Sequence, residues 1–332
     1  MTNLKTSFAG LQLKNPIIVS SSGLTNSVEK NRKLCEAGAG AIVLKSLFEE
    51  QIMMEVDTMQ DSVYYPEGAD YLRESLKNHK LSEYLTLIEE SKKACPIPII
   101  ASINCFNDTE WVHFAQEIEH AGADAIEINI LALQTDLEYE YGDFEQRHID
   151  ILRSVKKHVT IPVIMKLGYR FTNPVTLINQ LYANGAAAVV LFNRFYQPDI
   201  DIEKMEHCTE NVFSHPKELS KSLRWIGIAS SVVDKIDYAA SGGVHAPEDV
   251  VKAILSGASA VEICSTIYMN TNAYIGVMLR FLNAWIARKG FESVAQFKGR
   301  LRVKDVKGVN TFERTQFLKY FNDYKEKQKI DI

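Results

Sequence analysis

The sequence predicts an α/β protein, a single (β/α)8 TIM barrel with long insertions at its C-terminal mouth. One pattern occurs four times: a helical segment, a glycine, a short apolar run and a polar residue. The copies are AGAGAIVLKS (37–46), AGADAIEINI (121–130), NGAAAVVLFN (184–193) and SGASAVEICS (256–265). Each glycine suits the positive backbone φ angle of a helix C-cap, and each apolar run suits a parallel strand buried on both faces. The pattern is the repeating unit of a parallel α/β fold.

Four further apolar runs alternate with these copies and also end in polar residues or glycine. They are Pro16–Val19, Ile97–Ile103, Ile161–Met165 and Asp237–Ala240. Eight strands with helical segments between them, in a chain of 332 residues, fit one barrel domain spanning residues 1–332. An open doubly wound sheet is the alternative, but SSSGLTN after the first strand is not the GxGxxG turn that such a sheet normally shows.

The remaining segments complete the barrel in chain order. Residues 1–15 predict a lead-in hairpin that closes the bottom of the barrel, with Ala9-Gly10 as its turn. Two insertions, 47–80 and 195–224, are expected at the mouth; the first is either a lid or substrate wall, or an irregular surface excursion. Helices are expected at 27–37, 81–94, 108–121, 148–158, 173–184, 246–256 and 274–286, with a short one in GFESVAQFKGRL.

Composition excludes several classes of function. The net charge is −5 and no basic face stands out, which disfavours nucleic acid and anionic membranes as partners. No apolar run has the length of a signal peptide core or a membrane span. The five cysteines are scattered and form no CxxC, so we expect neither a metal site nor a disulfide framework, and a reducing cytoplasm fits best.

Two lysines, Lys45 and Lys166, end two of the buried strands and are the predicted catalytic residues. A lysine at such a position is unfavourable unless its ammonium meets an anion or solvent. Two ammonium groups facing one cavity indicate a ligand that is negative or becomes negative during a reaction. The alternative is that both side chains reach out to water.

The last two loops of the predicted barrel have the composition of a phosphate site. Gly242 and Gly243 follow the seventh strand, and Cys264, Ser265 and Thr266 follow the eighth. Glycines let backbone N–H groups approach a phosphate, and hydroxyl groups add donors. An ordinary tight turn and a helix cap are the alternative.

Three asparagines at strand ends, Asn104, Asn129 and Asn193, offer amide donors and acceptors to a planar polar ring. Taken singly, each is better explained as a cap or turn residue.

These residues and their surroundings resemble the dihydroorotate dehydrogenase family and the related pyrimidine-reducing domain of dihydropyrimidine dehydrogenase. The resemblance covers nearly the whole chain. The segments that carry it are NPIIVSSSG, VLKS, PIIASINCFN, GADAIEIN, IPVIMKL, SGGV, SGASAVEICS and GFESVAQFKGRL. It implies an FMN-containing barrel that exchanges a hydride between a dihydropyrimidine and flavin N5. It also implies a cytoplasmic homodimer that acts in pyrimidine biosynthesis on a small, pyrimidine-like acid.

The resemblance assigns roles to individual residues. Lys45 and Lys166 would lie near the flavin ring, with Lys166 opposing the charge that the reduced ring gains near N1. The pyrimidine would bind Asn129 and Asn193, and Arg194 could pair with a substrate carboxylate. The remaining predicted cofactor-binding residues are Ser20, Ser21, Ser46, Ser102, Asn104, Gly242, Gly243, Cys264 and Ser265, together with Asn129.

The chain departs from the family pattern on the substrate side. Where the family has NLSCPN or its serine version, with a general base, this chain has NILALQ, and Ala132 stands at the position of the base. Tyr139 and Tyr141 are candidates for a substitute. The family's asparagine in the first insertion is replaced near Glu67, Arg194 stands where a small hydroxyl residue is usual, and the usual GGxSG is missing.

Three hypotheses follow. The first is an FMN-dependent oxidoreductase of the dihydroorotate dehydrogenase type. The second is a flavin-binding relative that no longer turns over dihydroorotate, because Ala132 cannot take a proton. The third is a flavin-free lyase that uses Lys166 as a Schiff base, since barrels commonly place such a lysine at a strand end.

Overall fold

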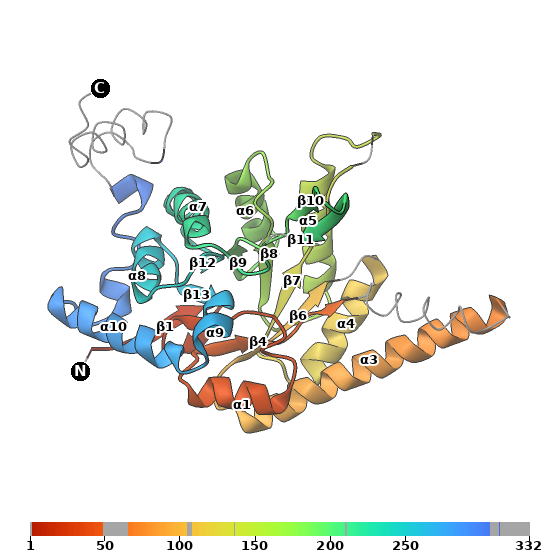
Figure 1. The fold of residues 1–332 in the computed structure, drawn as a ribbon, viewed down its shortest axis with the longest axis horizontal. Helices are drawn as coiled ribbons and strands as arrows, with labels where there is room; N and C mark the ends of the chain where they lie inside the picture. The colour runs from red at the N-terminus through yellow and green to blue at the C-terminus, as the bar shows by residue number, and fades with distance from the viewer. Residues whose placement is uncertain are drawn as a thin grey trace.

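The central element is a closed ring of parallel strands, seen in a computed structural model that describes residues 2–48, 66–104, 108–135, 137–209, 211–305 and 312 (Figure 1). The ring order is β4-β3-β13-β12-β9-β8-β7-β6, and pairing of β4 with β6 closes it. This arrangement confirms the predicted (β/α)8 barrel. Its strands are β3 (Ile17–Val19), β4 (Ala41–Val43), β6 (Ile99–Asn104), β7 (Ala125–Asn129), β8 (Val163–Leu167), β9 (Ala188–Leu191), β12 (Asp237–Ser241) and β13 (Ala260–Ile263).

The strands form because their residues can be buried on both faces. Alternate residues belong to two different cores: in β3, Ile17 and Val19 pack in the outer core under the helices, whereas Ile18 packs in the inner core. The inner core also contains Ile164 of β8 and Ala188 of β9. Because side chains alternate along a strand, residues two positions after the inner-core residues also face the barrel interior, nearer the mouth.

A hairpin closes the N-terminal end of the barrel. β1 (Thr6–Phe8) and β2 (Leu11–Leu13) pair antiparallel, and the turn has positive φ at both Ala9 (54°) and Gly10 (80°). Phe8, Ala9 and Leu13 are buried in the inner core with Ile18 and Ile164. The Ala9 N–H also donates to the Asp237 carboxylate over 3.0 Å. The hairpin therefore fills the end of the barrel opposite the mouth.

Helices cover the outside of the ring in the expected alternation (Figure 1). They are α1 (Val28–Glu36), α3 (Pro66–Ala94), α4 (Asp108–His120), α5 (Asp143–Lys156), α6 (Pro174–Ala183), α7 (Leu219–Val232), α8 (Pro247–Ser256), α9 (Ser265–Asn270) and α10 (Tyr274–Arg288). Side-chain caps fix two of the predicted starts, because Ser27 accepts from the Lys30 N–H and Asn173 from the Thr176 N–H. None of the helices in the described part of the chain has the length and apolar character that crossing a bilayer requires.

The prediction that residues 47–80 are irregular was wrong for much of that segment. Leu47–Phe48 form β5, which pairs with β6, and α3 begins at Pro66, well before the predicted residue 81. Proline suits the first turn of a helix, and the residues that follow are mostly good helix formers, although Pro66 and Gly68 were interpreted as a turn. In Figure 1, α3 extends past the barrel. Residues 49–65 lie outside the described part, so a lid there stays a prediction.

The second insertion, 195–224, also contains regular structure. β10 (Pro198–Asp201) and β11 (Glu206–Thr209) pair as an antiparallel hairpin, and a 3-10 turn at Pro216–Glu218 leads into α7. The expected insertion therefore overlapped the start of α7, which was not predicted. Two other boundaries differ: α5 begins at Asp143 rather than at His148, and the segment GFESVAQFKGRL contains a short 3-10 turn at Val294–Gln296.

Candidate active site at the barrel mouth

A cavity of about 750 Å³ lies at the carboxyl ends of the strands, and we call it the mouth cavity. Predicted site residues that line it are Ser21, Lys45, Ser46, Asn129, Lys166, Asn193, Arg194, Cys264 and Ser265. A second hollow of about 150 Å³, the glycine pocket, shares several of these walls and adds Ser20, Gly242 and Gly243. The two lysines therefore face one cavity, and its volume lies within the roughly 300–1,000 Å³ typical of small-molecule sites.

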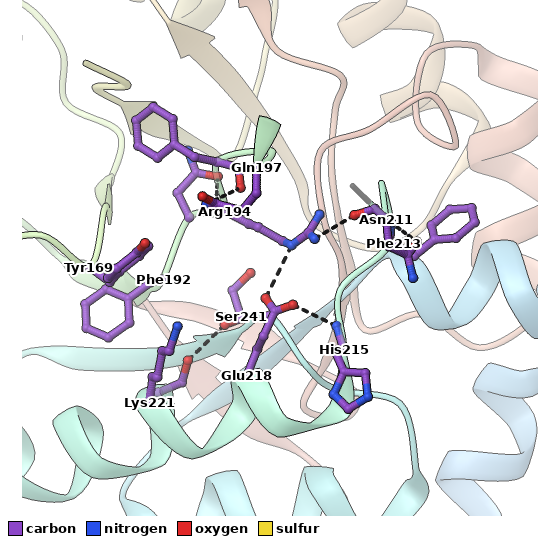
Figure 2. Close-up of a pocket in the computed structure, with 14 residues that line it drawn as sticks. Tyr169, Phe192, Arg194, Gln197, Asn211, Phe213, His215, Glu218, Lys221 and Ser241 are labelled. Atoms are coloured by element: carbon purple, nitrogen blue, oxygen red, sulfur yellow. Dashed lines mark hydrogen bonds and ion pairs between the residues drawn. The ribbon is translucent and has the colours of Figure 1, made fainter. Parts of the chain in front are cut away.

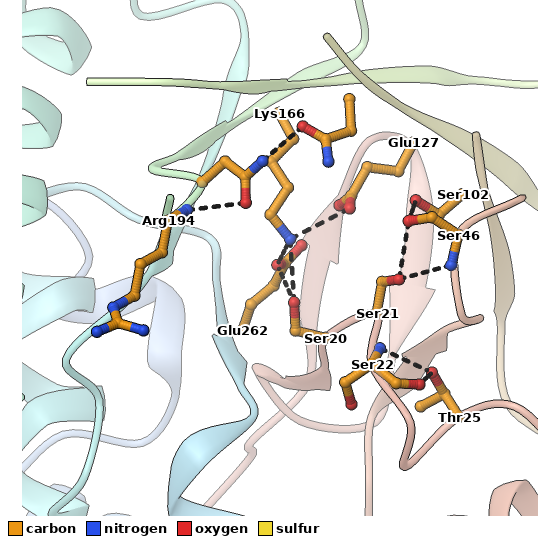
Figure 3. A network of polar contacts seen from close by, with 12 residues as sticks. Ser20, Ser21, Ser22, Thr25, Ser46, Ser102, Glu127, Lys166, Arg194 and Glu262 are labelled. Atoms are coloured by element: carbon orange, nitrogen blue, oxygen red, sulfur yellow. Dashed lines mark hydrogen bonds and ion pairs between the residues drawn. The ribbon is translucent and has the colours of Figure 1, made fainter. Parts of the chain in front are cut away.

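Two predicted residues, Ser102 and Asn104, are buried in β6 and are not among the described residues that line the mouth cavity. Ser102 is connected to it through a row of hydroxyl groups. Its Oγ lies 2.8 Å from Ser46 Oγ, which lies 2.9 Å from Ser21 Oγ (Figure 3). The row connects residues in or just after three neighbouring strands, and it fixes the orientation of the Ser21 and Ser46 hydroxyl groups, which line the cavity.

Lys166 is held in a buried group of four polar residues, Ser20, Glu127, Lys166 and Glu262, which we call the Lys166 cluster (Figure 3). The Lys166 ammonium lies 2.7 Å from Glu262 Oε2, 3.3 Å from Glu127 Oε1 and 3.0 Å from Ser20 Oγ. Ser20 also donates to Glu262 Oε2 over 2.8 Å. The exposed fractions of Lys166, Glu127 and Glu262 are 6%, 1% and 2%, so these charges interact almost without water.

The surroundings shift the pKa values of all three ionisable groups. Burial alone would lower the pKa of Lys166, but the carboxylates of Glu127 and Glu262 outweigh it and raise that pKa. Burial and the neighbouring Glu262 raise the pKa of Glu127 well above its usual range. Burial opposes ionisation of Glu262 too, but Lys166 and the hydrogen bonds to Glu262 lower its pKa. Lys166 is therefore a cation with Glu262 as its closest anion.

Sequence reasoning missed both glutamates, which were included in the apolar runs AIEIN and AVEIC. A signal was present, because Glu127, Lys166 and Glu262 each lie two positions after an inner-core residue: Ala125, Ile164 and Ala260. In the β7–β8 register Glu127 pairs with Ile164, and Lys166 lies two positions after Ile164 on the same face of β8. The side chains of Glu127 and Lys166 therefore both point into the barrel. A charge inside a buried run, at the interior phase of the strand, predicts an interior polar group.

Lys45 has different surroundings from Lys166. It is half-buried, and its ammonium lies 4.7 Å from the centre of the Phe48 ring, a cation–π contact. Burial lowers its pKa. Lys45 is therefore the more exposed of the two cations that face the cavity, and its pKa is lowered by burial, whereas carboxylates raise that of Lys166.

The two asparagines predicted to bind substrate lie together in the mouth cavity. Asn193 Nδ2 donates to Asn129 Oδ1 over 2.7 Å, and Asn193 Oδ1 accepts from the Arg194 N–H over 2.8 Å. The contact joins the ends of β7 and β9 and fixes which way each amide faces.

The Arg194 guanidinium is occupied by protein groups. It donates to the backbone carbonyls of Val212 (2.6 Å) and Asn211 (2.8 Å), and it lies 3.3 Å from the Glu218 carboxylate (Figure 2). These contacts hold the segment before α7 against the end of β9. Arg194 and Glu218 line a further cavity of about 390 Å³, next to the mouth cavity. Pairing of Arg194 with a substrate carboxylate stays a prediction, and it would require exchange of these partners.

The glycine pocket combines an open backbone with clustered hydroxyl groups. Gly242 and Gly243 have φ of 85° and 73°, and a Cβ on Gly243 would lie 2.3 Å from the Leu219 nitrogen at the start of α7. Ser265 Oγ accepts from the Ser214 N–H over 3.0 Å, and Ser214 Oγ lies 2.9 Å from His245 Nε2. Sequence reasoning missed Ser214 and His245. Backbone N–H groups, hydroxyl groups and an imidazole N–H are donors that suit a phosphate.

The position of the missing base carries no titratable group, and the proposed substitutes lie elsewhere. Tyr139 OH accepts from the Phe144 N–H at the start of α5, and Tyr141 is fully exposed. Neither is among the described residues that line the mouth cavity. Tyr268, from α9, does line it, and burial raises its pKa.

Comparison with known proteins agrees with this architecture. The family model for dihydroorotate dehydrogenase matches residues 3–283. Catalytic subunits named dihydroorotate dehydrogenase B (NAD(+)) are similar along most of their length. The protein of Thermoplasma volcanium is 26% identical over 307 residues, which cover 90% of this chain and 98% of that protein. For Methanocaldococcus jannaschii the identity is 27% over 273 residues, covering 80% of this chain and 87% of that protein.

A third relative, from Methanosarcina mazei, carries the same name and is 27% identical over 312 residues, covering 89% of this chain and 94% of its own. The family model spans the barrel strands from β3 to β13 and every residue of the Lys166 cluster. This chain belongs to the dihydroorotate dehydrogenase family.

Proposed function

We propose that this member of an oxidoreductase family binds FMN in the mouth cavity and exchanges a hydride with a dihydropyrimidine or a similar small planar acid. The observation that carries the proposal is the convergence of Lys45 and Lys166 on one cavity that continues into the glycine pocket. A ring that becomes anionic on reduction and carries a phosphate matches both features.

The residues present fit FMN. Gly243, Ser265 and Ser214 would hold the phosphate, because they surround a pocket with backbone and hydroxyl donors. Ser21, Ser46 and Lys45 would line the ring, and Lys166 would lie at its edge. When bound, the flavin supplies a position that accepts or returns a hydride. The protein's part is to orient the ring and to exclude water from the Lys166 cluster.

Substrate would lie against the paired amides of Asn129 and Asn193, which present a fixed donor and acceptor pattern. Hydride removal from a dihydropyrimidine also needs a group that takes a proton, and Ala132 cannot do this. Because a general base contributes typically ~10²–10⁴-fold, oxidation of dihydroorotate is expected to be slow.

The first test is cofactor binding. Purified protein incubated with FMN and passed through a desalting column should retain flavin absorbance, and Lys166→Met should weaken that retention. Colourless protein after this treatment would refute the FMN proposal. The apoprotein fold, checked by circular dichroism, distinguishes loss of the site from loss of the structure.

The second test restores the missing base. Ala132→Cys should increase the rate at which dihydroorotate bleaches the bound flavin, up to the ~10²–10⁴-fold that a general base supplies. Ala132→Val is the matched control, because it adds bulk without an acid–base group. Rapid bleaching of the wild-type protein, unchanged in Ala132→Cys, would mean that another group already takes the proton.

The alternatives differ in what they predict. A flavin-binding protein without turnover is favoured by Ala132 alone, and it predicts that wild-type flavin is not bleached by dihydroorotate. A Schiff-base lyase needs a neutral amine, but Lys166 is held as an ammonium by two carboxylates. Borohydride trapping with carbonyl compounds is therefore expected to leave Lys166 unlabelled.

The homodimer and the cytoplasmic location stay predictions that rest on the family resemblance. Light scattering of the eluting holoprotein measures the first directly, and a mass of one chain would contradict it.

A further inference from the structure

The Lys166 cluster contains two acids and only one base. If Glu127, Lys166 and Glu262 were all ionised, a net negative charge would be buried at the inner end of the mouth cavity, where each of the three is at most 6% exposed. Burial of an uncompensated charge is strongly unfavourable, so one of the two carboxyl groups should hold a proton. The contacts decide which one.

Glu262 is the better placed anion. Its Oε2 lies 2.7 Å from the Lys166 ammonium and also accepts the Ser20 hydroxyl over 2.8 Å. Glu127 makes one longer contact, 3.3 Å, from Oε1. Its Oε2 is buried and has no hydrogen-bond partner among the described residues, and neither has Glu262 Oε1. Two charge-assisted hydrogen bonds stabilise a carboxylate more than one long one.

We propose that Glu262 is the permanent counter-ion of Lys166 and that Glu127 carries a proton, so the cluster is electrically neutral toward the ligand of the mouth cavity. The charge state follows from the chain itself, whereas its effect on the ligand rests on the proposed FMN site. Glu127 lines the mouth cavity, where its neutral carboxyl group adds no negative charge. An ionised Glu127 would instead repel a ligand that becomes anionic.

This arrangement makes Glu127 and Glu262 positioning residues with a shared function. In Glu127→Gln, Lys166 keeps Glu262. In Glu262→Gln, Glu127 loses its proton and becomes the counter-ion, at the longer distance. Only the double variant Glu127→Gln/Glu262→Gln leaves a buried ammonium without a carboxylate. The single substitutions should therefore have small effects on the charge that the ligand meets, and the double variant a large one.

The charge state can be tested without any flavin. Infrared spectra of the wild-type apoprotein near neutral pH should show a protonated carboxyl band that is absent from Glu127→Gln and from Glu262→Gln. In chemical unfolding, Glu262→Gln should destabilise more than Glu127→Gln, and the double variant more than the sum of the two. Glu203→Gln, on an exposed turn, is the control for loss of one acid. Absence of a Glu127-dependent band, or equal destabilisation by both singles, would overturn the proposal.

The effect on the ligand is measured as the flavin midpoint potential. Each single variant should stay close to the wild type, whereas the double variant should bind reduced FMN at least tenfold more tightly relative to oxidised FMN. For a two-electron couple this corresponds to a rise of about 30 mV. A Glu127→Gln rise of about half that of the double variant would show that Glu127 is ionised, because the single substitution would then remove one negative charge and the double substitution two. If the double variant does not fold, the infrared comparison still decides, and if no FMN binds, only the cofactor proposal fails.

Discussion

At the scale of single residues, two lysines with the same position in the sequence pattern have different roles in the structure. Lys166 is buried between two carboxylates, whereas Lys45 is half-buried over an aromatic ring. The sequence predicted that both would face one cavity because each ends a barrel strand. It did not predict the difference, because the partners of Lys166 come from β7 and β13, which are distant in sequence and are brought together only by closure of the barrel.

This difference predicts unequal effects on stability. Lys166→Met should lower the free energy of unfolding of the apoprotein by about 3–5 kcal/mol, because it leaves a buried carboxylate without its cation. Lys45→Met should lower it by about 0.5–1 kcal/mol, the range of a cation–π contact near the surface. Chemical unfolding near neutral pH measures both, and equal losses would contradict the described surroundings.

At the scale of elements, four copies of the pattern of glycine, buried strand and polar residue, together with four further apolar runs, located all eight barrel strands, because strands buried on both faces give continuous apolar runs. It was less informative for helices. Gly68 in α3 and Gly227 in α7 weaken a helical pattern, yet both residues lie inside helices. The segment before α7 gave no periodic signal, since side-chain contacts such as that of Arg194 with Glu218 fix it instead.

The Arg194–Glu218 contact should control local opening at the mouth. Glu218 Oε2 pairs with Arg194, and Oε1 accepts the His215 N–H over 2.7 Å. Glu218→Gln keeps an acceptor for that N–H and removes the charge, so it should lower the opening free energy of residues 211–215 by only ~0.2–1 kcal/mol. Glu218→Ala removes both contacts and should lower it further, by ~1 kcal/mol.

Hydrogen exchange of the amides between Asn211 and His215 measures this local opening. Glu203→Gln, on the exposed turn between β10 and β11, is the control that should leave the exchange unchanged. Exchange that is equally fast in Glu218→Gln and Glu218→Ala would show that the ion pair, and not the His215 N–H contact, holds the segment.

At the scale of the whole molecule, the fold was predictable because one unit repeats around the barrel, whereas the site was predictable only in part. Ends of strands are visible as polar residues after apolar runs. Interior charges such as Glu127 and Glu262 are visible only when the strand phase is known, and Ser214 reaches Ser265 from an insertion without a pattern. Repeated local sequence patterns thus specify the barrel, whereas contacts between residues distant in sequence specify the site.

Global stability should depend on pH through His148. This residue is fully buried, its Nδ1 lies 2.7 Å from the Phe144 carbonyl, and burial lowers its pKa from 6.5 to about 4. The unfolded chain therefore binds a proton at a higher pH than the folded chain does. The contribution of His148 is complete above about pH 6.5 and is lost as the pH falls toward 4, an overall change of roughly 3 kcal/mol.

Unfolding free energies near pH 7 and near pH 4 test this dependence. His148→Phe should reduce the difference between the two conditions by roughly 3 kcal/mol, since it removes the titrating ring. His158→Phe is the matched control, because His158 also contacts the carbonyl four residues earlier but is exposed. If both variants keep the full wild-type difference, other groups cause the acid sensitivity.

The β1–β2 hairpin has a consequence for the order of events in catalysis. Phe8, Ala9 and Leu13 fill the inner end of the described barrel, so molecules approach Lys166 from the strand ends at the other side. If the barrel binds a flavin as proposed, a hydride donor and a hydride acceptor that both visit its ring would share a single route. The first would then have to depart before the second arrives, and alternating, ping-pong turnover is the kinetic form expected for such a reaction.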